Sequence, residues 1–120
     1  MRVLVVLGCL MSGMVGLRAE DRLAMRVSPA AAVAPAFLRV EVSVARDPTN
    51  RKLAIVAESP DFYRSSEVQV NGEAGPRVYV FEFPQLPSGV YEVRGILGDN
   101  RGDTVTAMRM VRVAPGLGER

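Results

Sequence analysis

Apolar residues recur at every second position from Leu23 onward, and turn-forming residues interrupt them about every ten positions. A period of two is typical of β-strands with one buried face, and no segment has the three-and-four spacing of an amphipathic helix. The pattern therefore predicts seven strands joined by short turns. We expect them over residues 23–27, 37–45, 52–58, 62–70, 77–83, 90–97 and 104–113.

Four further features shape this prediction. The Ala/Pro-rich stretch 30–36 suits neither a helix nor a regular ladder and predicts an irregular crossover. Asn71 and Gly72 tolerate positive φ and predict a tight hairpin turn after the fourth strand. Residues 77–83 are apolar on both faces, as expected of a strand deep in a sheet or close to a partner. Arg109 interrupts an apolar row of the last strand, where we expect a bulge or an edge position.

The number of strands limits the architecture. Seven strands within about 95 residues are best accommodated by an all-β, two-sheet Greek-key sandwich. A chain of 120 residues holds one such domain at most. We divide it into a signal peptide over residues 1–19, the sandwich over residues 20–115 and a flexible tail over residues 116–120.

The N-terminal residues have the composition of an export signal. Arg2 supplies a positive charge, and residues 3–17 form an uncharged apolar run. The run is shorter than the ~20 residues that a membrane-spanning helix needs. We expect a secretory signal peptide that is cleaved after Ala19 or, as a second choice, after Gly16. The mature protein is then secreted or periplasmic.

Cys9 is the only cysteine of the chain. The residues before it resemble a lipobox weakly, but apolar sequence continues well past Cys9, which disfavours a lipid anchor there. Membrane attachment is therefore expected only through an uncleaved signal or such an anchor. The mature domain has no disulfide, and export without disulfides favours a bacterial envelope over an animal extracellular protein.

The small positive net charge of +2 comes from the N-terminal segment. Arg2 and Arg18 lie there, whereas all thirteen acidic residues lie from Glu20 onward, so the mature part is balanced. Its arginines are also dispersed among apolar strand positions. Binding of nucleic acid needs clustered Lys and Arg, so the sequence argues against a nucleic-acid partner.

The segment 86–93, Leu-Pro-Ser-Gly-Val-Tyr-Glu-Val, carries the one motif of the chain. It resembles the entry to strand F in immunoglobulin-like and fibronectin type III-like domains of secreted bacterial proteins. The resemblance implies that Tyr91 forms a tyrosine corner, with its ring buried and its hydroxyl bonded to upstream backbone. Gly89 would allow the tight turn before it, and Leu86 precedes the turn. The Cys pair and central Trp of antibody-type domains are missing.

The residues needed for most catalysis are missing too. The chain has no His, its mature part has no Cys, and Lys52 is its only lysine. These absences exclude Cys–His and Ser–His arrangements and leave only carboxylate sites for hard cations. Asp99, Asn100 and Asp103 do not have the spacing of a calcium loop. We predict no enzyme activity, no cofactor and no metal. The glutamates at outward strand positions are interpreted as solvated side chains rather than a glycosidase pair: Glu41, Glu58, Glu82 and Glu92.

Two segments are candidate interaction sites. Arg101, Gly102 and Asp103 form an Arg-Gly-Asp tripeptide in the loop between the last two strands, where fibronectin type III domains can present it to integrins. These are also ordinary turn residues, and that interpretation is preferred. In the segment Phe62-Tyr63-Arg64, adjacent aromatic residues cannot both face the core of a regular strand. One ring is then exposed beside an arginine, or one caps the sandwich while the other lies on the sheet.

The sequence thus predicts a non-catalytic, exported, immunoglobulin-like interaction or structural module of the bacterial envelope, with another protein as its partner. An open sandwich has free edges and the last strand carries few charges, so pairing along a strand edge is available to it. The alternative is an accessory domain that binds a small molecule or a glycan.

Overall fold

The computed structural model describes residues 22–117, which form eight β-strands and one short 3-10 helix. No helix in this part of the chain is long and apolar enough to cross a membrane. The predicted signal peptide, Cys9 and the last three residues of the predicted tail lie outside the described residues. The elements are β1 (Leu23–Ser28), β2 (Ala31–Val33), β3 (Ala36–Val44), β4 (Asn50–Ser59), β5 (Phe62–Gln69), η1 (Gly72–Ala74), β6 (Val78–Leu86), β7 (Gly89–Asp99) and β8 (Thr104–Ala114).

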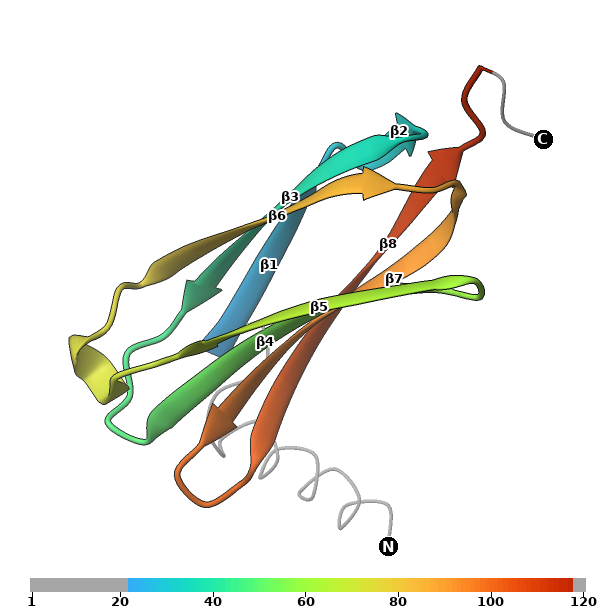
Figure 1. Cartoon of the computed structure of the whole chain (residues 1–120). Coiled ribbons are helices and arrows are strands. Elements are labelled where there is room, and N and C mark those ends of the chain that lie inside the picture. The colour runs from blue at the N-terminus through green and yellow to red at the C-terminus, as the bar shows by residue number, and fades with distance from the viewer. Residues whose placement is uncertain (1–21, 118–120) are drawn as a thin grey trace, which may run out of the picture.

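The strands form two sheets that lie one over the other (Figure 1). The first sheet has three strands in the order β1-β3-β6, and the second has five in the order β2-β8-β7-β4-β5. Neighbouring strands are antiparallel except β2 and β8, which are parallel. The predicted all-β class with two packed sheets is confirmed.

The core lies between the sheets because one face of each central strand is apolar. On β3 the inward residues Leu38, Val40 and Val42 are fully buried, and Leu53 and Ile55 of β4 belong to the same buried cluster. Burial of each such side chain contributes about 1.5–3 kcal/mol to the free energy of unfolding. This alternation is what the period of two predicted.

β2 occupies a stretch that was predicted to be irregular. Residues 31–33 pair in parallel with residues 112–114 of β8, and the Ala34 amide donates to the Ala114 carbonyl at 2.8 Å. Three residues are too few to show a period in the sequence. The strand forms because the C-terminal end of β8 offers it unpaired backbone groups.

The segment between β5 and β6 is not a hairpin. Gly72 has φ 55°, as its turn-forming character suggests, but η1 begins there and the chain crosses from one sheet to the other. β6 is an edge strand of the three-stranded sheet, so the expectation of a strand deep in a sheet is wrong. Phe81 and Phe83 face the core, whereas Val78 and Val80 on the other face are 47% and 44% exposed.

Candidate functional site

Strand β8 is hydrogen-bonded to a neighbouring strand on one side only over most of its length, and β1 of the other sheet lies across a groove from its residues 109–111. Residues 104–113 pair with β7 in an unbroken antiparallel register, whereas β2 borders only residues 112–114 on the other side. Within residues 22–117, the stretch 104–111 therefore presents an unpaired backbone edge, the β8 edge. The register passes through Arg109 without a shift, so the predicted bulge is wrong and the alternative, an edge position, is observed.

The outer face of β8 is apolar and exposed beside this edge. Met108 and Met110 are 45% and 57% exposed, and Val90 of the neighbouring β7 is half-exposed on the same face. β8 has no acidic residue, and its only charged residues are Arg109 and Arg112. Natural edge strands are usually protected by lysine, proline or a bulge. The β8 edge has no lysine, proline or bulge, and within residues 104–111 its only protecting charge is Arg109, which lies in the inward-facing row.

A groove of about 290 Å³ lies between β1 and β8 at the same edge. Two guanidinium groups line it, those of Arg26 and Arg109. Arg26 lies 3.6 Å from a carboxylate oxygen of Glu41, and Arg109 donates to the Met108 carbonyl of its own strand at 2.8 Å. The remaining lining residues are apolar: Met25, Val27, Ala30, Met110 and Val111.

The candidate segment Phe62-Tyr63-Arg64 is divided between two sides of β5. Phe62 turns inward and packs edge-on against Tyr91, with ring centroids 6.3 Å apart and planes at 73°. The Arg64 guanidinium lies over the Phe62 ring at 5.0 Å and donates to the Pro84 carbonyl at 2.6 Å. Tyr63 is 59% exposed on the outer face. Phe62 therefore packs against β7, Arg64 links β5 to β6, and Tyr63 is the exposed residue of the three.

The tripeptide Arg101-Gly102-Asp103 forms the exposed tip of the β7–β8 hairpin. One carboxylate oxygen of Asp99 accepts from the Arg101 amide at 2.8 Å and from the Asp103 amide at 2.9 Å. The first of these bonds is the largest cause of a lowered pKa of Asp99. Gly102 adopts φ 89°, which favours glycine. The local contacts account for these residues as a turn.

The two candidate segments lie at opposite ends of the five-stranded sheet. Phe62 pairs with Ser59 at the end of β4, whereas Asp99 at the hairpin tip pairs with Asn50 at its start. The structure therefore does not bring them together into one site.

The motif residues around Tyr91 have a structural role. Tyr91 has no exposed surface, and its hydroxyl donates to the Pro87 carbonyl at 2.7 Å. Leu86 is fully buried next to this turn. A Cβ on Gly89 would lie 3.3 Å from the Cβ of Ser59, so the turn requires a small residue there. This local geometry resembles a tyrosine corner, and none of these residues lies on an open surface.

Three of the four candidate glutamates, Glu41, Glu58 and Glu92, lie in ion pairs with arginines on the outer faces of the sheets. Arg94 donates to Glu92 at 2.7 Å and to Glu58 at 3.2 Å, in a partly exposed cluster on the five-stranded sheet. Desolvation alone would lower the pKa of Arg94, but these hydrogen bonds raise it above its usual value. Exposed pairs of this kind contribute little stability. The carboxylates are held by arginine and do not face each other across a cleft.

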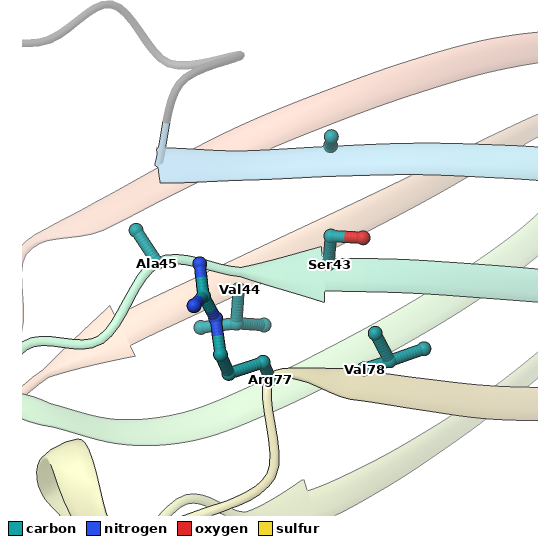
Figure 2. A pocket seen from close by; sticks show the side chains of 6 residues that line it. Ser43, Val44, Ala45, Arg77 and Val78 are labelled. Carbon is teal, nitrogen blue, oxygen red and sulfur yellow. The ribbon is translucent and has the colours of Figure 1, made fainter.

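Two further hollows are open and carry no catalytic constellation. One, of about 400 Å³, lies at the ends of β3 and β6, where the Arg77 side chain extends toward Ala45 (Figure 2). The other, of about 530 Å³, lies beside the hairpin tip and includes Lys52, which is paired with Glu67 at 3.1 Å. Neither contains a group with a free nucleophile next to a base.

Comparison with known proteins identifies the fold through solved structures alone. No protein-family model and no curated protein matches the sequence. The chain is similar to superoxide reductase (neelaredoxin) from Ignicoccus hospitalis, with a TM-score of 0.61 and 18% identity over 77% of this chain and 80% of that one. Two variants of that protein give the same TM-score and identity, covering 80% and 77% of this chain and 90% and 79% of theirs.

These likenesses contradict the assignment to immunoglobulin-like or fibronectin type III-like domains, because the fold is that of neelaredoxin. They also contradict the prediction of a non-catalytic immunoglobulin-like module, because the similar structures are superoxide reductases, which are redox enzymes. At 18% identity the likeness establishes the fold. The comparisons do not bear on the expected protein partner or on export, which stay predictions.

A redox metal does not fit the residues that the structure describes. The ligands that hold redox-active transition metals in proteins are mostly His and Cys, with carboxylates beside them. This chain has no His, and Cys9 precedes the described part. Among residues 22–117, no three side chains of His, Cys, Asp or Glu are grouped so that they could hold a metal ion.

Proposed function

We propose that this chain, built on the superoxide reductase fold, binds a partner protein by strand addition at the β8 edge. The observation that carries the proposal is the unpaired stretch 104–111, which is open on one side and flanked by Met108 and Met110. An extended segment of another protein can pair there with backbone donors and acceptors that have no partner strand.

The side chains beside the β8 edge favour a protein over other ligands. Exposed methionines adapt to irregular apolar surfaces, so Met108 and Met110 suit contact with the side chains of an added strand. The hollow beside the hairpin tip is lined by polar side chains and glycines and has no apolar side chain against which a small molecule could be buried. The hollow at the ends of β3 and β6 has only Ser43 and Arg77 as polar side chains. The absence of acidic residues from β8 leaves no carboxylate to repel the carbonyl groups of an incoming strand.

Site-specific photocrosslinking in the expressing cells tests the proposal. A photoreactive residue replaces Thr106, which is exposed on the outer side of the β8 edge, and in a matched variant it replaces Ser43, exposed on the outer face of β3. We expect a discrete crosslinked protein product from position 106. We expect none from position 43.

The crosslinked peptide is then identified by mass spectrometry. A polypeptide crosslinked at position 106 supports strand addition if the crosslink is lost when Met108→Lys is added. Lysine on an edge strand opposes the pairing of another strand there. Equal products from positions 106 and 43, or no product from either, would refute the proposal.

We further propose that the protein acts outside the cytoplasm. The apolar run 3–17, bounded by Arg2 and Arg18, supports a cleaved signal peptide. Intact mass of the exported protein is expected to place its first residue at Glu20. A mass that includes Met1 in the purified envelope fraction would contradict cleavage.

The likeness to superoxide reductases favours a second candidate, a role in the reduction of superoxide. Because residues 22–117 offer no metal-binding group, such a role needs a redox group from another molecule. Superoxide decay, followed with and without the purified protein in an extract of its own cells, tests it. Faster decay with the protein would support this role, and an unchanged rate would exclude it.

A further inference from the structure

We infer that the strand added at the β8 edge is the β8 edge of a second copy of this chain, so that two copies form one continuous sheet. This inference rests on the proposed strand addition and names its partner. The register that two β8 edges can adopt, and the charges that this register brings together, support it.

Two self-pairing registers fit the unpaired stretch 104–111, and the charges decide between them. In an antiparallel pair, residues that lie opposite each other project to the same face. Two β8 strands related by a twofold axis must therefore be centred on a residue, and centring on Ala107 pairs residue 104 with residue 110 of the second copy. The unpaired stretch 104–111 is used almost fully, and residues 112–114, which already pair with β2, stay outside the pairing. Centring on Met108 would pair residues 105–111 and also avoid β2, but it places Asp103 opposite residue 113 of the second copy and away from Arg109.

The same register separates like charges. Arg109 lies opposite Val105 of the second copy, whereas centring on Arg109 would place the two guanidinium groups face to face. Like charges directly opposite each other destabilise a strand pair. On the outer face Met108 lies opposite Thr106, and the two Met108 side chains become diagonal neighbours across the axis, within reach of each other.

The register also supplies a carboxylate where the groove beside β8 has only cations. By the period of two, Asp103 projects to the same face as Val105 and is the diagonal neighbour of Arg109 in the second copy. The groove is lined by Arg26 and Arg109 and by no acidic side chain. Asp103 is exposed, and the hydrogen bonds that hold the hairpin tip use its backbone amide and carbonyl rather than its side chain. The twofold axis creates this Arg109–Asp103 pair twice.

Sedimentation equilibrium of the purified protein, from the expressed full-length chain, is the direct test. We expect a reversible dimer within concentrations up to about 100 µM, where micromolar interfaces are filled. Met108→Lys places two ammonium groups on diagonal positions and should weaken the dimer more than about tenfold. Val80→Lys is the matched control, because Val80 is equally exposed on the outer face of the other sheet. It should change the dimer constant less than about twofold.

A charge exchange tests the register itself. Arg109→Asp and Asp103→Arg each place like charges on diagonal positions and should each weaken the dimer about threefold or more. The double variant restores opposite charges and should return the constant to within about threefold of the original protein. Thermal unfolding of each variant verifies that it folds.

The outcomes separate this inference from the proposal on which it rests. A monomer at all concentrations, or a dimer that Met108→Lys and Val80→Lys weaken alike, overturns the second copy as partner. Crosslinks from position 106 to a different protein would then keep strand addition and replace its partner. Absence of crosslinks from position 106 together with a monomer would overturn both.

Discussion

Tyr91 and its hydrogen bond show how a short motif acts on stability within a fold of another family. The ring fills the core beside Phe62, and the hydroxyl satisfies the Pro87 carbonyl at the turn into β7. Any two-sheet sandwich has such turns to close, so the motif specifies a local contact and not a family. The residue could be placed from the sequence because the segment 86–93 combines a turn and a strand.

Removal of the Tyr91 hydroxyl should therefore destabilise the protein. Tyr91→Phe leaves the Pro87 carbonyl without this donor, and we expect the free energy of unfolding to fall by about 1–2 kcal/mol. Denaturant titration measures the change. Tyr63→Phe is the control, because Tyr63 is 59% exposed and its hydroxyl can bond to water, so it should change stability by less than about 0.5 kcal/mol. Equal losses in the two variants would refute the role given to the hydroxyl.

Asp99 gives the hairpin tip a pH dependence. Its carboxylate accepts two backbone hydrogen bonds, and its pKa is lowered from the ordinary value of 3.8 chiefly by the bond from the Arg101 amide. A lowered folded-state pKa means that the contribution is fully present above the unfolded-state pKa. It is lost as the pH falls below about 4 through the folded-state pKa.

Asp99→Asn keeps an acceptor at this position but removes the titration. We expect the variant to lose less stability than the original protein between about pH 5 and pH 2. Denaturant midpoints at a series of pH values measure the slope. The pKa of Asp47 is also lowered, mainly by its hydrogen bond with the Thr49 side chain. Asp47 is present in both proteins, so both should keep the part of the pH dependence that it causes. Identical slopes would show that the bonds to Asp99 do not favour its charged form.

Among the elements, those with one buried face could be placed from the sequence. β3 was predicted at 37–45 and spans Ala36–Val44, and β7 was predicted at 90–97 and spans Gly89–Asp99. Burial of alternate residues leaves a period that a single sequence displays. Arg109 interrupts the inward-facing apolar row of β8. It indicated an edge strand because a guanidinium in such a row is tolerated where the row is open to solvent.

β2 and β6 were not predictable in the same way. β2 has three residues and depends on the end of β8, which lies about eighty positions later in the chain. β6 is apolar on both faces although its outer face is open, so its composition suggested a buried strand. In both cases the deciding information is the identity of the neighbouring strand, which local periodicity does not contain.

At the scale of the whole molecule, the order of strands in the two sheets decided the fold and could not be obtained from the pattern of single strands. An immunoglobulin-like sandwich and the neelaredoxin fold share alternating strands and short turns. They are distinguished by which strands pair. The candidate surface could likewise be predicted only in part. The low charge of the last strand was visible in the sequence, whereas the length of its free edge depended on where β2 pairs.

The lack of a cluster of metal ligands in the described part of the fold predicts that metal ions do not stabilise the complete protein. Among residues 22–117 no three candidate ligands are grouped, and the Asp99 carboxylate already accepts two amides. A ligand that binds only the native state raises the free energy of unfolding by RT ln(1 + L/Kd), where L is the free ligand concentration. We therefore expect Fe²⁺ under anaerobic conditions, and Ca²⁺ separately, to shift the melting temperature by less than about 1 °C, and EDTA to have no effect. A rise in the melting temperature of several degrees that EDTA reverses would reveal a metal site that these residues do not form by themselves. Metal-dependent dimerisation in the same samples would then locate that site between two copies.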